Sequence, residues 1–314
     1  MKTYLDCIPC FYKQALMAAR MSGASEEVQR EVLNNLSKVA LSFTLTTTPA
    51  EMGREIYAMI SKITGKKDPY REIKEKSNKL ALNLLPYLYE KIINSDDRLL
   101  TALRLAIIGN IIDFGVKTNE EDIYNKMNSL IEENIDSQIS QLINDNEHFI
   151  YNAFKEYLLD VETILYLADN AGEVVFDRIL IEVLVNYYHK NVIYAVKGKP
   201  VLNGALVDDA IICGINSYAN VISTGTDSPG IILKYCSPEF IRIFNNAEMI
   251  ISKGQGNFEA LSEEDNPLFF LLIAKCPVIA RHLKCNIGDF ILENNFKKKN
   301  ISITKSTETD NIES

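Results

Sequence analysis

The chain has 314 residues and a mass of 35.5 kDa, enough for two domains or for one large domain with an extension. Hydrophobic residues make up 47% and charged residues 24%, which is typical of globular proteins and excludes a disordered or fibrous chain. The 33 lysines and arginines and the 42 aspartates and glutamates give a net charge of −9 at pH 7. We therefore expect no nucleic-acid partner, because such a surface repels a phosphate backbone.

The chain begins without the apolar core of a secretory signal, because Asp6 stands where that core would lie. No window reaches the roughly 18 consecutive apolar residues that a membrane-spanning helix needs. We therefore expect a cytoplasmic protein without a membrane partner. Its six cysteines are then expected to be reduced thiols or part of a metal site, rather than a disulfide framework.

Residues 1–155 have the pattern of a helical domain. Apolar residues recur at three- and four-residue intervals from Ile8 to Met21. A third helix is predicted to begin at Thr48, which is the N-cap, with Pro49 in the first turn and Glu51 three residues after the cap. The predicted helices cover about 8–21, 25–43, 48–64, 70–93, 95–108 and 119–134.

Residues 156–296 alternate between short apolar runs and helical stretches, which indicates βαβ units and a parallel sheet. The class predicted from these patterns is therefore α/β. Residues 297–314 form a polar tail that we expect to be frayed. The predicted strands are 162–168, 191–196, 218–223, 248–252 and 268–274, and the predicted helices are 173–188, 207–213, 238–245 and one from about 278.

The first candidate site is the polar loop Asp169-Asn170-Ala171-Gly172-Glu173, which directly follows a predicted strand. In a doubly wound sheet, ligands bind beyond the carboxyl ends of the strands. Carboxylate and amide oxygens suit a hard divalent cation. Aspartate and asparagine are also the residues that cap helices best, so an N-cap pair without a ligand remains the alternative.

Two further loops follow predicted strands. The hydroxyls and glycines of residues 223–230 suit either an anion or a simple turn. In residues 252–259, Lys253 leaves a strand into a glycine turn, where it is well placed to meet a phosphate. This loop lacks the third glycine of a dinucleotide fingerprint, and its lysine precedes the glycines, unlike in a Walker loop.

Cys7 and Cys10 form a CxxC pair at a predicted helix start, where backbone amides lower a thiol pKa. One such pair is half of a structural zinc site, and the sequence contains no second CxxC pair to complete it. Cys276 and Cys285 are candidates for the remaining ligands, although their spacing fits no standard pattern. A metal or redox role and a role as packed thiols both remain open. His148, His189 and His282 are isolated in the sequence, and we find no Ser-His-Asp pattern.

Five ordered blocks of the sequence occur together: Asp6-Cys7-Ile8-Pro9-Cys10, Gly109-Asn110-Ile111-Ile112-Asp113, Asp169-Asn170-Ala171-Gly172-Glu173, Thr224-Gly225 with Pro229-Gly230, and Lys253-Gly254-Gln255-Gly256-Asn257-Phe258-Glu259. Together they resemble the metal-dependent damage-control phosphatases, a family long known as a domain of unknown function. The resemblance implies an N-terminal helical domain packed on a Rossmann-like, mainly parallel αβα domain. A divalent metal (manganese, cobalt, nickel or magnesium) would bind in the cleft between them.

The same resemblance implies roles for individual residues. Asp169 and Asn170 would bind the metal, and Asp169 and Lys253 would be catalytic. Lys253 would also bind the substrate, together with Asn110, Asp113, Glu173 and Asn257.

One position departs from the family. The family's further metal-binding aspartate follows an asparagine, whereas this chain reads Pro200-Val201-Leu202-Asn203-Gly204. Asp208 or Asp209, one turn later, is a candidate replacement. If neither aspartate replaces the missing ligand, the metal keeps two side-chain ligands, and the affinity of the site for the metal is expected to fall.

The predicted function is the metal-dependent hydrolysis of small phosphorylated metabolites, including damaged or surplus sugar phosphates. Charge neutralisation by the metal and Lys253 suits phosphate-ester hydrolysis. We favour attack by water over attack by the Asp169 carboxylate. The alternatives are a binding protein that has lost catalysis because of Gly204, and an S-adenosylmethionine-dependent carboxyl methyltransferase. The oligomeric state is open.

Overall fold

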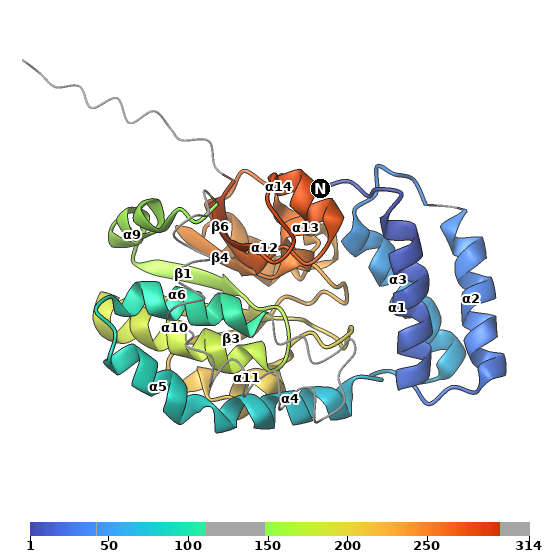
Figure 1. Cartoon of the computed structure of the whole chain (residues 1–314), viewed down its shortest axis with the longest axis horizontal. Coiled ribbons are helices and arrows are strands. Elements are labelled where there is room, and N and C mark those ends of the chain that lie inside the picture. Colours follow the sequence, from blue (N-terminus) through green and yellow to red (C-terminus); the bar gives the residue numbers. More distant parts are fainter. Residues whose placement is uncertain (42, 111–147, 296–314) are drawn as a thin grey trace, which may run out of the picture.

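The computed structural model describes residues 1–41, 43–110 and 148–295 (Figure 1). Asp113, the helix predicted at 119–134 and the tail 297–314 lie outside the described residues. The predicted α/β class is confirmed, with helices first and a mainly parallel sheet after them.

Three helices form a bundle with its own core, seen on the right of Figure 1. As predicted, Thr48 caps the third helix, and Thr48 and Glu51 form a reciprocal capping box. Ser25 caps the second helix. Gly65, at φ 69°, ends the third helix in the left-handed conformation that glycine adopts most readily. The helices are α1 (Cys7–Met21), α2 (Glu26–Ala40) and α3 (Pro49–Thr64).

The next helices belong to a different core, which they share with α10 (Glu173–Tyr188) on one face of the sheet. The single helix predicted over 70–93 is wrong, because the chain breaks at Leu84. Pro86 cannot donate a backbone hydrogen bond, so it fits only in the first turn of a new helix. These helices are α4 (Arg71–Asn83), α5 (Leu85–Ile93) and α6 (Arg98–Gly109).

The sheet has six strands in the order β3-β2-β1-β4-β5-β6. All neighbours are parallel except the last pair, where β6 runs antiparallel to β5. The strand order reverses between β1 and β4, and such a switch point is where doubly wound sheets bind ligands. The strands are β1 (Thr163–Leu167), β2 (Asn191–Val196), β3 (Asn220–Ser223), β4 (Met249–Lys253), β5 (Leu268–Ile273) and β6 (Phe290–Asn294).

The two faces of the sheet are covered by separate sets of helices, as αβα layering requires. Along β1, Ile164 and Tyr166 face the core with α6 and α10, whereas Leu165 and Leu167 face the other core. This alternation follows from the two-residue period of a strand. The helix α11 (Val207–Ile212) lies beside β3, and the second face is covered by α12 (Pro238–Asn245), α13 (Gln255–Leu261) and α14 (Pro277–Leu283).

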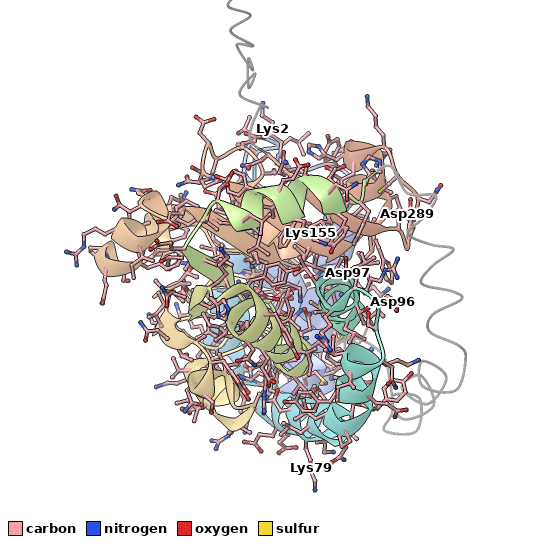
Figure 2. All side chains as sticks on the ribbon, turned by 90° about the vertical axis from the view of Figure 1, so that its left-hand side faces the viewer. Lys2, Lys79, Asp96, Asp97, Lys155 and Asp289 are labelled. Carbon is pink, nitrogen blue, oxygen red and sulfur yellow. The ribbon has the colours of Figure 1, made fainter. Side chains whose placement is uncertain are left out.

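The helix α9 (Tyr151–Leu159) was not predicted. Its Phe154 packs edge-on against Phe269 of β5, with ring centroids 5.1 Å apart. Lys155 also forms an ion pair of 3.2 Å with Asp97, the N-cap of α6, and both residues are labelled in Figure 2. The helix therefore joins β5 to α6. Among the described helices, none is long and apolar enough to cross a membrane.

Replacing Phe154 by alanine should destabilise the protein by about 3–5 kcal/mol, because it opens a cavity beneath α9. Denaturant unfolding followed by circular dichroism measures this change. Leu159→Ala is the matched control on the same helix, since that side chain is 64% exposed and should change stability by less than about 0.5 kcal/mol. Equal effects of the two substitutions would show that α9 does not contribute to the core.

Candidate active site

The candidate site lies beyond the carboxyl ends of β1, β2 and β4. Asp169 and Asn170 follow β1, Lys197 follows β2, and Lys253 is the last residue of β4. Because these strands are neighbours, the fold brings the first and third predicted loops to one place. In Figure 1 this edge of the sheet faces the α1–α3 bundle.

A buried network joins two carboxylates to two amides. Gly172, at φ 84°, turns the chain so that Glu173 begins α10. Asn170 donates its amide to Asp169 Oδ2 at 2.9 Å and to Glu173 Oε1 at 2.8 Å. Asn110, from the end of α6, donates to the same Glu173 oxygen at 2.9 Å and to Asp169 Oδ2 at 3.4 Å. The structure thus brings together four of the predicted site residues.

Lys253 is fully buried and points into the protein rather than into solvent. Its ammonium group lies 2.7 Å from Asp177 Oδ1 and 3.3 Å from Glu173 Oε2. Burial lowers the pKa of Lys253, but Asp177 and Glu173 outweigh this effect and raise it above the usual value. The lysine is therefore held charged by two carboxylates of α10.

Asp177 is a central residue of the network that sequence reasoning missed. Besides Lys253, it accepts hydrogen bonds from Tyr166 at 2.7 Å and from Tyr194 at 2.8 Å. The sequence contained a signal that could have identified Asp177. This residue stands one helical turn after Glu173 and therefore lies on the same face of the predicted helix. Tyr166 and Tyr194 are also register partners on β1 and β2.

Lys197 is a second buried ammonium group that was not predicted. It is 2% exposed, and its Nζ donates to Asn257 Oδ1 at 3.1 Å. Burial lowers its pKa, and the nearby Asp169 opposes this effect. The sequence signal that could have identified Lys197 is its position directly after the apolar strand 191–196, which is the neighbour of β1.

Asn257 uses its whole amide in hydrogen bonds within the protein. Its Oδ1 accepts from Lys197 and from the backbone of Ile231, and its Nδ2 donates to the carbonyls of Ala168 and Lys253. Asn257 thus fixes the ends of β1 and β4 and orients Lys197.

Two glycines limit what can surround Asp169. A Cβ on Gly254 would lie 1.8 Å from Asp169 Oδ2, and Gly254 has φ 79°, so glycine is required there. Gly204 forms an antiparallel bridge with Asn170. A Cβ on Gly204 would lie 3.1 Å from Lys197 Cγ and 3.1 Å from the carbonyl of Val201. The stem of Lys197 therefore lies close to the place of the expected aspartate side chain.

The two candidate replacements for that aspartate lie in different surroundings. Asp209 accepts hydrogen bonds from Asn78 at 2.7 Å and from the backbone of Leu206 at 2.9 Å, so it holds α4 against the start of α11. Asp208 is exposed.

A divalent cation fits the composition of the site. Among the described residues, no group of three or more histidine, cysteine, aspartate or glutamate side chains could hold a metal, so a cation bound here would need amide oxygens as well. The buried carboxyl groups of Asp169, Glu173 and Asp177 outnumber the ammonium groups of Lys197 and Lys253. Burial and the charge of Glu173 raise the pKa of Asp169. In addition, the buried Oδ1 of Asn110 has no hydrogen-bond partner within the described part of the chain.

The CxxC cysteines lie at the start of α1, and within the described residues no hydrogen bond joins them to this network. Both are free thiols, and Cys10 is exposed. Burial and nearby groups, including Glu259 and Cys276, raise their pKa values above the ordinary value. Such thiols stay protonated at neutral pH, which is unfavourable for nucleophilic redox chemistry.

Comparison with known proteins identifies relatives along nearly the whole chain. A family model described as the damage-control phosphatase ARMT1-like domain matches residues 3–291. The damage-control phosphatase PH1575 of Pyrococcus horikoshii is 36% identical over 300 residues, covering 95% of this chain and 100% of that protein. The uncharacterised protein MJ0202 of Methanocaldococcus jannaschii is 37% identical over 295 residues, covering 91% of this chain and 93% of that protein.

A solved structure shows the same fold. The crystal structure of a DUF89 family protein from Pyrococcus horikoshii matches with a TM-score of 0.81 at 34% sequence identity, covering 94% of this chain and 99% of that one. The resemblance inferred from the five sequence blocks is therefore confirmed.

Removing the Asp177 carboxylate should destabilise the protein, because it leaves Lys253 with one buried partner instead of two. We expect Asp177→Asn to cost about 3 kcal/mol in the free energy of unfolding. Adding Lys253→Met should recover part of this loss, since the double variant no longer buries the ammonium group that lost its partner. Denaturant titration of both variants measures the difference, with the exposed Asp160→Asn as control. A double variant that is less stable than Asp177→Asn alone would contradict this account of the network.

Proposed function

The chain belongs to the damage-control phosphatase ARMT1-like domain family, and on this premise we propose that it hydrolyses small phosphorylated metabolites with the help of a divalent cation. One observation carries the proposal: buried carboxyl and amide oxygens gather at the carboxyl ends of β1 and β4, with more buried carboxyl groups than ammonium groups. Such a site attracts a cation, and a cation in turn attracts a phosphoryl group.

Asp169 and Asn170 would hold the cation, and the unpartnered Oδ1 of Asn110 is a further donor. When bound, the cation supplies charge that neutralises the phosphoryl oxygens and lowers the pKa of water. Glu173 fixes the amides of Asn110 and Asn170 through its Oε1. Lys253 holds Glu173 in turn, so these groups are oriented before any ligand arrives.

Lys197 would contribute positive charge beside Asp169, where a phosphoryl group would lie. Its orientation depends on Asn257, which accepts its hydrogen bond. We propose that water attacks the phosphorus, because Asp169 is already bound by the amides of Asn110 and Asn170. Trapping of a phosphorylated Asp169, detected by mass spectrometry, would contradict this mechanism.

A binding protein without catalysis is the second candidate, because one observation favours it. Gly204 supplies no ligand, and the stem of Lys197 lies within 3.1 Å of where its Cβ would be. The cation would then have fewer carboxylate ligands and bind less tightly. One observation argues against the methyltransferase alternative. The loop after β1 reads Asp-Asn-Ala-Gly-Glu, whereas a cofactor-binding loop at this place would be rich in glycine.

The test is hydrolysis of p-nitrophenyl phosphate by the purified protein with Mn²⁺, Co²⁺, Ni²⁺ or Mg²⁺. We expect activity that EDTA removes and that Asp169→Ala lowers by at least about 100-fold, because that side chain orients the reacting groups. Asp96→Ala is the control, because this aspartate is exposed and lies just before the N-cap of α6. The Asp96→Ala variant should be as active as the wild type.

A Gly204→Asp variant separates the two candidates. Activity in this variant but not in the wild type would favour the binding protein, and activity in neither would contradict a phosphatase acting on this ester. Calorimetric titration with S-adenosylmethionine tests the methyltransferase directly, and we expect no binding.

A further inference from the structure

A pocket of about 350 Å³ lies between the helical bundle and the loop that follows β2. One side is formed by α3 and the segment after it, from Arg54 to Tyr70. The other side is formed by Lys199 to Leu202, with Asp227 from the loop after β3. The pocket thus opens at the carboxyl ends of β2 and β3, at the same edge of the sheet as the candidate active site.

The pocket carries an excess of positive charge. Its two acidic residues are neutralised, because Asp68 pairs with Lys74 at 2.7 Å and Asp227 pairs with Arg54. Three lysines remain that form no ion pair with any described residue: Lys66, Lys67 and Lys199. In a chain of net charge −9, three unpaired ammonium groups around one pocket favour an anionic ligand.

The remaining lining is mostly apolar, with Ser61 and two tyrosines as its polar members. Ile60, Tyr70 and Val201 are buried and line the pocket together with Pro69 and Pro200. An apolar wall beside lysines suits an organic skeleton that ends in an anionic group, rather than a free inorganic ion.

The loop that forms one wall is held firmly. Leu202 packs against the core of the helical bundle and has φ 49°, a conformation that costs free energy for a residue with a side chain. Strain of this kind persists where surrounding structure fixes the backbone, and it is common at ligand sites.

The same loop joins the pocket to the active site. Leu202 lies two residues before Gly204, so their Cα atoms are at most about 7 Å apart. Gly204 is the bridge partner of Asn170, which places their Cα atoms about 5 Å apart. The pocket wall therefore lies within roughly 12 Å of Asn170, a span that one small metabolite can bridge.

We propose that this pocket binds a second anionic group of the substrate, so that the preferred substrates are phosphate monoesters carrying a further phosphate or carboxylate. The inference rests on the proposed function, because it places the first phosphoryl group beside Asp169. Lys199 is central to this inference, since it belongs to the loop that runs from the pocket to Gly204, the bridge partner of Asn170.

Calorimetric titration in EDTA tests binding without metal-dependent turnover. The probes are glucose 6-phosphate, with one anionic group, 6-phosphogluconate, with an added carboxylate, and fructose 1,6-bisphosphate, with an added phosphate. We expect at least one of the two doubly anionic probes to bind about tenfold or more tightly than glucose 6-phosphate, as charge-assisted hydrogen bonds to lysine would give. The tighter of the two shows which second group the pocket takes.

Substitutions of pocket lysines test whether the preference for doubly anionic probes depends on this pocket. Lys199→Ala and Lys67→Ala should each reduce it severalfold, and Lys199→Arg should restore it. Lys62→Ala is the matched control, because this exposed lysine of α3 does not line the pocket. All of these side chains are exposed, so the variants should fold, and circular dichroism checks that they do.

Equal affinity for all three probes, no measurable binding of any probe, or a preference that survives Lys199→Ala, would overturn the inference. Failure of the proposed function looks different, because it is the absence of metal-dependent hydrolysis of p-nitrophenyl phosphate. The binding experiment does not depend on that activity and still decides whether the pocket recognises a second anionic group.

Discussion

The organisation of the site depends on one buried ammonium group. Lys253 lies at the end of β4, and its two partners, Glu173 and Asp177, lie on the first turns of α10. The ion pairs therefore tie the strand that follows the switch point to the helix that follows β1. Without this charge, the carboxyl groups of α10 and Asp169 would be buried side by side with Lys197 as their remaining buried cation. Burying like charges together is unfavourable, because each carboxylate disfavours the ionised form of the other and an unpaired buried charge is costly.

Around this ion pair, each polar group positions the next. Asp177 is held by two tyrosines from β1 and β2, so the sheet itself fixes the anchor of Lys253. Glu173 then orients the amides of Asn110 and Asn170, which reach Asp169. The network begins in the core of the sheet and ends at Asp169, where a ligand would bind. Such an arrangement reduces the reorganisation that binding and reaction require.

Local sequence signals predicted much of this architecture, and tertiary contacts determined the rest. The capping box at Thr48 and the strand 191–196 depend on neighbours in sequence, and both are found as predicted. The antiparallel β6 was missed, since it is defined by backbone pairing with β5 and with Phe149, which are distant in sequence. Lys197 and Asp177 were missed for a related reason. A charged residue that ends a strand or lies on a helix is assumed to be solvated until its buried partners are known.

Gly204 and Lys197 are best understood together. Because Gly204 has no side chain, the stem of Lys197 can pass close to the backbone opposite Asn170 and remain buried. An aspartate at position 204 would add a carboxylate and would require Lys197 to move. The glycine therefore removes one negative charge from the surroundings of Asp169 while leaving the ammonium group beside it. Both effects make the site less negative, which weakens its attraction for a cation and strengthens its attraction for a phosphoryl group.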